Sequence, residues 1–186
     1  MLIIENFLTP EALIIANDIK NNFYKLENKR LGWTNATWDP YLFGPSSLTF
    51  VIPIPELDEH LLPLFEKADP IFKGARIDSQ FCVWGKGSTI PFHNDHHVAF
   101  AATVYLNESW EIEDGGLFLW KDHNTNELLV ANPKYNLCVI NNLHEPHHVS
   151  VVSYGAKQFR MTLQIWAHVI HGDDTKPLDL DVFKYE

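Results

Sequence analysis

The chain of 186 residues carries 24 acidic and 14 basic side chains, which gives a formal net charge of −10, and 46% of its residues are hydrophobic. This length and composition are typical of a globular chain, and we expect one domain spanning residues 1–186. The acidic surplus disfavours nucleic acid as a partner, because the field of such a chain repels phosphate backbones.

The first residues predict a short strand and then a helix. Leu2 to Ile4 form an apolar run, and Thr9 is a residue type that commonly caps a helix. Pro10 suits the first helical turn, where its missing N–H would have no partner. Apolar residues then recur at helical spacing as far as Phe23, so we expect an amphipathic helix.

The expected lack of a targeting signal and the presence of two free cysteines favour a cytoplasmic location. Glu5 and Asn6 interrupt the apolar N-terminus, which is therefore not expected to act as a signal peptide. No apolar run reaches the roughly 20 residues that a membrane-spanning helix requires, so we expect no membrane partner. The two cysteines, Cys82 and Cys138, each lie in an apolar run and are predicted to be buried free thiols.

Aromatic residues gather in the stretch 30–55, where Gly and Pro predict an irregular loop that leads into a strand at 48–52. The aromatic residues of this loop are Trp33, Trp38, Tyr41 and Phe43. Trp33, Trp38 and Tyr41 are candidate substrate-binding residues if the loop forms a lid or groove. The alternative, which the sequence leaves open, is that the loop only supports the strands. A second helix is predicted over 56–68, which makes the N-terminal third, about 1–70, helical.

From residue 75 onward the sequence predicts a series of short strands. Runs rich in Val, Ile, Thr and aromatic residues are punctuated by Gly, Asn and Asp. The predicted strands are 76–84, 98–106, 116–120, 128–130, 137–140, 147–152 and 159–170. Strands at this spacing are typical of a sandwich or jelly roll, with the helices packed on one outer sheet face. We therefore expect a mainly β fold with N-terminal α-helices and a jelly-roll core over about 75–170.

The stretch PFHNDHH, residues 91–97, holds three histidines and one acid within seven residues. Residues two apart in a strand face the same side, so His93 and Asp95 would share one face and could bind a single ion. His96 and His97 are expected to support the site or to face solvent. A pair of ligands does not hold a metal ion, so a third ligand must come from elsewhere in the chain.

The other histidine cluster is HEPHH, residues 144–148. In a strand that starts here, His147 shares its face with Val149 and Val151, whereas His148 shares its face with Ser150 and Val152. The face of His147 is therefore the more apolar one. The more apolar face is expected to point inward, which favours His147 over His148 as the third ligand. His144 precedes Pro146 and is predicted to lie in a turn.

Two histidines and one carboxylate, with open coordination positions, are typical of the facial triad of non-haem iron(II) oxygenases. Three protein ligands on one side leave the opposite side for a co-substrate and O₂. The sequence has no set of thiolates that would favour a structural zinc site. Taken alone, the H-x-D motif is also consistent with an ordinary surface pair.

The segments around this motif resemble a known enzyme family. In chain order they are H-x-D at 93–95, YLN at 105–107, GG at 115–116, HHV at 147–149 and RMT at 160–162. Their order and spacing resemble the iron(II)- and 2-oxoglutarate-dependent dioxygenases of the prolyl 4-hydroxylase-like branch, whose strands carry H-x-D, Y-L-N, G-G, H-x-V and R-x-S/T. The resemblance covers about residues 82–167, and the N-terminal stretch NFLTPEA is also similar to that group.

The resemblance implies a double-stranded β-helix core, the cupin-like form of the jelly roll. It also implies Fe(II) bound by His93, Asp95 and His147, with 2-oxoglutarate as co-substrate, O₂ as oxidant and ascorbate as a further candidate cofactor. The implied reaction oxidises an unactivated C–H bond and releases succinate and CO₂. Because related halogenases lack the acid, the presence of Asp95 favours hydroxylation.

The distal carboxylate of 2-oxoglutarate needs a cation, and a guanidinium offers a planar two-point match. The family spacing after the glycine selects Lys157, whereas the spacing back from Trp166 selects Arg160, which we favour. Arg160 and Thr162 would share one strand face. By resemblance, Tyr105 and Thr162 also contact the co-substrate; a core role for Tyr105 is the alternative.

The sequence supports three functional hypotheses. The leading one is a 2-oxoglutarate dioxygenase that hydroxylates an amino-acid side chain, with a prolyl residue of a protein or peptide as the favoured substrate. The second keeps the same chemistry but acts on a free amino acid or another small molecule. The third, from another class, is a non-catalytic cupin-like module that binds metal or a partner. Arg160 argues against the third, because a structural metal site does not need a cation beside it.

Overall fold

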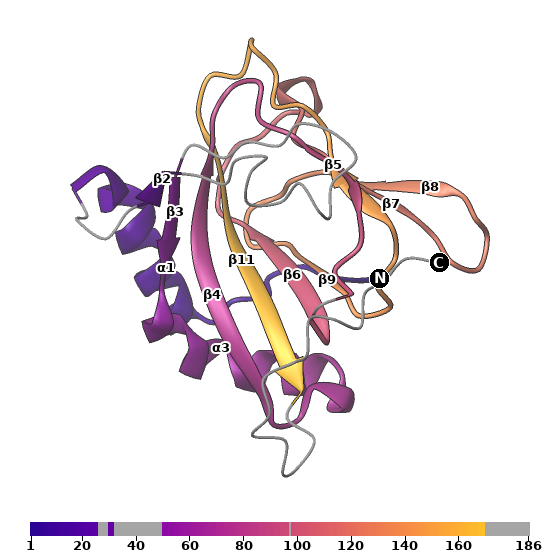
Figure 1. The fold of residues 1–186 in the computed structure, drawn as a ribbon. Helices are drawn as coiled ribbons and strands as arrows, with labels where there is room; N and C mark the ends of the chain where they lie inside the picture. The colour runs from indigo at the N-terminus through magenta and orange to yellow at the C-terminus, as the bar shows by residue number, and fades with distance from the viewer. Residues whose placement is uncertain (26–29, 32–49, 97, 170–186) are drawn as a thin grey trace.

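The structure is a computed structural model that describes residues 1–25, 30–31, 50–96 and 98–169. Two antiparallel sheets face each other, and two helices cover the outer face of the larger sheet (Figure 1). The described part of the chain therefore has the mainly β, jelly-roll architecture with N-terminal helices that the sequence predicts.

The larger sheet has seven described strands and the smaller has four. The order in the larger sheet is β1 (Leu2–Ile4), β9 (Cys138–Asn141), β6 (Phe100–Tyr105), β11 (Arg160–Val169), β4 (Ala75–Trp84), β3 (Phe50–Pro53) and β2 (Arg30–Leu31). The order in the smaller sheet is β5 (Ile90–His93), β10 (His147–Val149), β7 (Phe118–Lys121) and β8 (Leu128–Ala131). Three short 3₁₀ helices, Phe23–Lys25, Pro70–Phe72 and Ile112–Asp114, complete the described elements.

The two helices begin as the sequence indicates. α1 spans Pro10–Asn22, and the side chain of Thr9 caps it by accepting a hydrogen bond from the backbone N–H of Ala12 at 3.3 Å. α3 spans Pro55–Ala68, one residue longer than predicted, because its proline also fits the first helical turn. In Figure 1 both helices lie on the side of the large sheet away from the small one.

The main core lies between these helices and the outer face of the large sheet. Leu163 and Ile165 on the central strand β11 are fully buried there. Phe65 of α3 lies with its ring centroid 5.0 Å from that of Phe7 and 5.0 Å from that of Phe100. Since alternate residues of β11 point the other way, Arg160 and Thr162 are directed between the two sheets. Arg160 and Thr162 thus share one face of β11, as predicted, and the opposite face is apolar.

A second cluster of buried side chains fills the space between the sheets. It includes Trp84, Tyr105, Phe118 and Trp120, from strands of both sheets. These aromatic side chains supply a dry, low-dielectric setting for any polar group that points inward. The interior between the sheets is therefore suited to strong electrostatic interactions.

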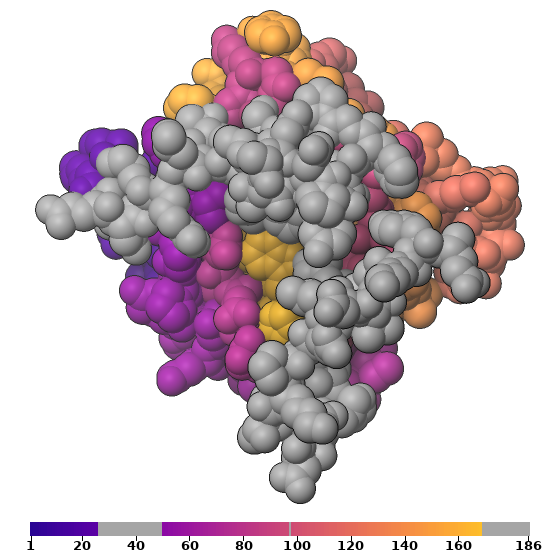
Figure 2. All heavy atoms as spheres, in the orientation of Figure 1, coloured from indigo at the N-terminus to yellow at the C-terminus, as the bar shows by residue number. Residues whose placement is uncertain are grey.

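Strand β5 is not among the strands predicted from the sequence, although the shared face predicted for His93 and Asp95 places His93 in a strand. It is only four residues long and contains Pro91, which breaks the usual strand pattern. Because β5 is an edge strand of the small sheet, a residue without an N–H is tolerated there. At the opposite edge, the β7–β8 hairpin projects at the right of the molecule (Figures 1 and 2), where Leu128 and Val130 are exposed.

Among the described residues, no helix is long and apolar enough to cross a membrane. The aromatic loop residues Trp33, Trp38, Tyr41 and Phe43 lie outside the described residues, so their role stays a prediction.

The two cysteines are unpaired and buried, as predicted. Burial raises the pKa of the Cys82 thiol to about 12, although the nearby Arg160 guanidinium opposes the shift, and burial also raises the pKa of Cys138. A thiol reacts as its thiolate, so neither side chain should react with a disulfide reagent at pH 8 while the protein is folded. Absorbance of the released chromophore should show two equivalents only after unfolding in urea. Rapid release from the native protein would contradict this expectation.

Candidate active site

Three candidate ligands converge at the β5 edge of the small sheet. His93 ends β5 and His147 begins β10, and the two are direct partners in the antiparallel pair. Nε2 of His93 lies 3.7 Å from Oδ1 of Asp95, and Nε2 of His147 lies 3.4 Å from Oδ2. All three side chains are nearly buried. The structure thus brings together the three residues that the sequence singled out.

The other nitrogen of each imidazole fixes the orientation of its ring. Nδ1 of His93 lies 2.8 Å from the carbonyl oxygen of Pro91, and Nδ1 of His147 lies 2.9 Å from that of Glu145. A carbonyl only accepts hydrogen bonds, so Nδ1 of His93 carries the proton and donates. Nδ1 of His147 also lies 3.1 Å from Nδ2 of Asn141, but that amide already donates to the Glu145 carbonyl, and we assign the Nδ1 proton of His147 from its shorter contact with the same carbonyl. In the neutral ring, Nε2 then has a free lone pair directed at the carboxylate. Carbonyl partners of this kind are typical of metal-binding histidines.

This donor set fits a cation. Two nitrogen lone pairs and a carboxylate that face one another repel unless a proton or a metal ion lies between them. Burial, reinforced by the neighbouring His147, lowers the pKa of His93 to about 4, although Asp95 opposes the shift. His93 is therefore unprotonated at neutral pH and available as a ligand. Two imidazoles and one carboxylate match the ligand preference of Fe(II).

The position of Asp95 differs from the prediction in one respect. The strand ends at His93, so Asp95 lies in the turn that follows, where its carbonyl accepts a hydrogen bond from the N–H of Val98 at 3.2 Å. Strand alternation therefore does not explain why the His93 and Asp95 side chains point the same way. The turn directs the carboxylate back toward the histidines.

The neighbouring histidines take other positions. His96 is exposed, with its ring centroid 5.4 Å from that of His144. His144 lies in the loop, and its Nε2 is 2.8 Å from the carbonyl oxygen of Val98. His148 points to the other side of β10, where its ring centroid is 4.4 Å from that of Phe92. His97 lies outside the described residues.

A second feature lies between the sheets: the side chain of Arg160 is completely buried. Its guanidinium carbon lies 4.7 Å from the ring centroid of Trp84 and 5.1 Å from that of Tyr105. Among the described residues, none of its three nitrogens makes a hydrogen bond, and neither does the Tyr105 hydroxyl. A buried cation without an acceptor is costly, so this pocket is preorganised for an anion such as a carboxylate.

Burial lowers the pKa of the Arg160 guanidinium and raises the pKa of the Tyr105 hydroxyl. The proximity of the two groups opposes both shifts. An arginine stays protonated even under such a shift, so the pocket keeps its positive charge. Lys157, the other candidate cation, is exposed on the surface.

Thr162 lies one inward position along β11 from Arg160 and is also buried. Its hydroxyl oxygen accepts a hydrogen bond from Nε1 of Trp84 at 3.0 Å. The hydroxyl proton of Thr162 is therefore free to donate to an anion held by the guanidinium. Trp84 was not singled out in the sequence; it faces Arg160 because the two residues are partners in the β4–β11 pair.

The sequence profile of the 2OG-Fe(II) oxygenase superfamily matches residues 79–168. This range contains the three candidate iron ligands and the three candidate co-substrate residues: His93, Asp95, His147, Tyr105, Arg160 and Thr162. The chain belongs to this superfamily. A search of curated protein sequences found no match to this chain.

Solved structures share the fold of this oxygenase. A prolyl-4-hydroxylase from Pseudomonas putida has a TM-score of 0.67 and 16% sequence identity, with 90% of this chain and 91% of that chain covered. A Trichoplax adhaerens prolyl hydroxylase, in complex with a hypoxia inducible factor peptide fragment, has a TM-score of 0.66 and 16% identity, with 90% and 82% covered. The epimerase SnoN of nogalamycin biosynthesis has a TM-score of 0.62 and 9% identity, with 89% and 76% covered.

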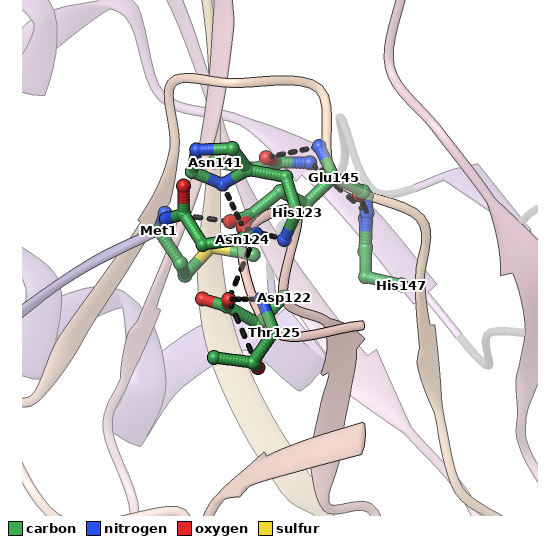
Figure 3. Close-up of polar contacts among 8 residues, drawn as sticks. All are labelled: Met1, Asp122, His123, Asn124, Thr125, Asn141, Glu145 and His147. Carbon is green, nitrogen blue, oxygen red and sulfur yellow. Dashed lines mark hydrogen bonds and ion pairs between the residues drawn. The ribbon is translucent and has the colours of Figure 1, made fainter. Parts of the chain in front are cut away.

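The iron-ligand candidate His147 of this oxygenase rests on a second layer of polar residues (Figure 3). The Asn141 amide brackets the backbone of Glu145: Oδ1 accepts from the Glu145 N–H at 2.9 Å, and Nδ2 donates to the Glu145 carbonyl at 3.0 Å. That same carbonyl accepts from Nδ1 of His147. Asn141 and Glu145 therefore hold the ring of His147 in place. Sequence reasoning missed both, although Glu145 lies within the HEPHH cluster.

The carboxylate of Glu145 is buried in an ion pair. Oε2 lies 2.6 Å from the amino group of Met1, and Oε1 accepts hydrogen bonds from the N–H and Nδ1 of His123 at 3.1 and 3.0 Å. Burial raises the pKa of Glu145, but these hydrogen bonds outweigh it and bring the pKa below the usual value. The carboxylate is consequently ionised at neutral pH.

Glu145 forms a second acidic cluster with Asp122 and His123, but these groups already have partners. Glu145 is neutralised by the amino group of Met1, and Oδ1 of Asp122 accepts hydrogen bonds from the backbone N–H groups of Asn124 and Thr125. The cluster is therefore a structural network, and we assign no metal to it.

Glu145→Gln is expected to destabilise this oxygenase by about 3 kcal/mol, because it leaves the amino group of Met1 without its charge partner. Urea unfolding followed by circular dichroism measures the loss. Glu5→Gln is the matched control, since Glu5 pairs with Lys134 at 3.2 Å on the surface and exposed pairs contribute only about 0–1 kcal/mol. Equal losses from the two variants would contradict the structural role of Glu145.

Proposed function

We propose that this oxygenase hydroxylates an amino-acid side chain, with a prolyl residue in a protein or peptide as the favoured substrate. It would consume 2-oxoglutarate and O₂ at an Fe(II) centre and release succinate and CO₂. The observation that carries the proposal is the buried Arg160 guanidinium, which has no hydrogen-bond partner among the described residues. It is linked to the His93–Asp95–His147 cluster through the buried aromatic residues between the sheets: Trp84 and Tyr105 contact Arg160, and Phe118 of the same cluster stacks on His147 at 5.0 Å between ring centroids. The prolyl substrate is supported by the fold that the chain shares with two prolyl hydroxylases.

The residues present fit both cofactors. His93, Asp95 and His147 would hold the iron through Nε2, a carboxylate oxygen and Nε2. Arg160 would bind the distal carboxylate of 2-oxoglutarate in a two-point contact, with Tyr105 and Thr162 as further donors. When bound, iron and 2-oxoglutarate together supply the activation of O₂ and the oxidation of a C–H bond.

The protein would orient and shield this chemistry. The carbonyls of Pro91 and Glu145 keep each imidazole proton on Nδ1, so Nε2 stays available at the centre. The Asp95 carboxylate would offset one of the two positive charges of a bound Fe(II) ion. The rings of Trp84 and Tyr105 exclude water from the guanidinium, which strengthens its attraction to a carboxylate.

The test of the substrate is succinate formation from 2-oxoglutarate with Fe(II) and O₂, measured over proline-containing peptides, the same peptides with alanine at each proline, and free amino acids. We expect turnover to rise with proline-containing peptides and to fall to the uncoupled rate with the alanine versions. Stimulation by free amino acids alone would support the small-molecule alternative. Absence of succinate under all conditions, with iron bound, would favour a non-catalytic module.

A further inference from the structure

Gly116 lies against the side chain of Arg160. It precedes β7 in the small sheet, whereas Arg160 begins β11 in the large sheet, so the two sheets meet here. A Cβ atom at Gly116 would lie 2.5 Å from Cδ of Arg160, 3.0 Å from its Nε and 3.2 Å from Cγ2 of Val152. Carbon atoms do not approach this closely, so any side chain at position 116 requires Arg160 to shift.

The glycine itself cannot easily move away. Its N–H donates to the carbonyl oxygen of Val151 at 3.1 Å, and its φ is +60°, a backbone conformation that favours glycine. The adjacent Gly115 is also held, because Val152 forms an isolated bridge to it. This wall of the pocket is therefore fixed by the backbone.

The guanidinium is also confined by the two aromatic rings. Trp84 contacts it and is itself held by the hydrogen bond from Nε1 to Thr162, and Tyr105 contacts it from its position on β6. Movement of Arg160 away from position 116 would change its contact with one or both rings. The guanidinium is thus packed in one position, and it can occupy that position because glycine has no side chain at position 116.

We propose that Gly116 is a positioning residue that sets the affinity for 2-oxoglutarate by fixing the Arg160 guanidinium. Gly116 itself does not touch the co-substrate. This inference rests on the proposed function, in which Arg160 binds the distal carboxylate. A two-point contact tolerates little displacement, so a shift of about 1 Å is expected to weaken 2-oxoglutarate binding by roughly 10- to 100-fold.

The test compares Gly116→Ala with Gly74→Ala. Gly74 also has a positive φ, of 74°, but a Cβ atom there would meet nothing within 4 Å, so this variant reports backbone strain alone. Binding of 2-oxoglutarate to the anaerobic Fe(II) protein is followed by the visible absorbance of the chelate. We expect a 10- to 100-fold higher dissociation constant for Gly116→Ala, about the wild-type constant for Gly74→Ala, and an unchanged affinity of both variants for Fe(II) alone.

The single variant Arg160→Ala, compared with Gly116→Ala, separates this inference from the proposed function, and the double variant Gly116→Ala/Arg160→Ala tests whether the two residues act through the same contact. If Arg160→Ala leaves 2-oxoglutarate binding unchanged, the proposed function fails. If Arg160→Ala weakens binding but Gly116→Ala behaves like Gly74→Ala, only the role of Gly116 fails. We expect the double variant to bind 2-oxoglutarate no more weakly than Arg160→Ala.

Stability in urea gives an independent measurement. The unfolding midpoint should fall further for Gly116→Ala than for Gly74→Ala, and removal of the Arg160 side chain should cancel the excess. Should Gly116→Ala fail to fold, folding of the double variant would still support the contact. Failure of both to fold would overturn the inference, because the clash would then lie with the backbone and not with Arg160.

Discussion

Arg160→Ala is expected to raise the 2-oxoglutarate concentration for half-maximal turnover by roughly 100-fold, because loss of one partner of a buried charged contact costs about 2–5 kcal/mol. The guanidinium is fully buried, and its nitrogens have no acceptor among the described residues. A carboxylate is the group that this environment lacks. Succinate formation at increasing 2-oxoglutarate, at fixed iron and O₂, measures the change.

Lys157→Ala is the matched control for this prediction. Lys157 is the other cation that the family spacing allows, but it is exposed and cannot offer a dry two-point contact. Its removal should leave the 2-oxoglutarate requirement within about twofold of the wild type, as expected for a screened surface charge. A large effect of Lys157→Ala with a small effect of Arg160→Ala would show that the co-substrate binds elsewhere.

The double variant Asp95→Ala/His147→Ala is expected to abolish the visible absorbance of the anaerobic Fe(II)–2-oxoglutarate chelate and to reduce succinate formation to background. The reason is that only one of the three candidate ligands would remain, and a single imidazole does not hold Fe(II) at micromolar concentration. Iron content after gel filtration provides a second measurement that does not depend on turnover.

His148→Ala controls for the loss of a histidine in the same strand. His148 is adjacent to His147 but points to the other side of β10, against Phe92. The chelate absorbance of this variant should match that of the wild type. An undiminished band in Asp95→Ala/His147→Ala, or a lost band in His148→Ala, would contradict the assignment of the ligands.

Features that depend on nearby residues were predictable from the sequence. The Thr9 cap, the alternation along β11 and the inward face of His147 all follow from chemistry within a few residues of each position. The sequence also predicted that the side chains of His93 and Asp95 point to the same side, but its reason was wrong, because Asp95 lies in the turn after β5 and not in a strand.

Features that depend on contacts between distant segments could not be predicted in this way. Trp84 meets Arg160 only because of the register between β4 and β11, and the amino group of Met1 meets Glu145 across 144 positions of sequence. No local pattern encodes either contact. β5 was missed for a different reason: Pro91 argues against a strand unless the strand lies at an edge, and edges are known only once the sheet is assembled.

The central strand β11 has a consequence for engineering. Its odd-numbered residues, such as Leu163 and Ile165, pack under the helices, and its even-numbered residues, such as Arg160 and Thr162, line the interior between the sheets. Stability and chemistry are thus interleaved along a single segment of ten residues. Substitutions at alternate positions of this one strand are therefore expected to change the proposed co-substrate pocket between the sheets while keeping the apolar side chains that pack under the helices.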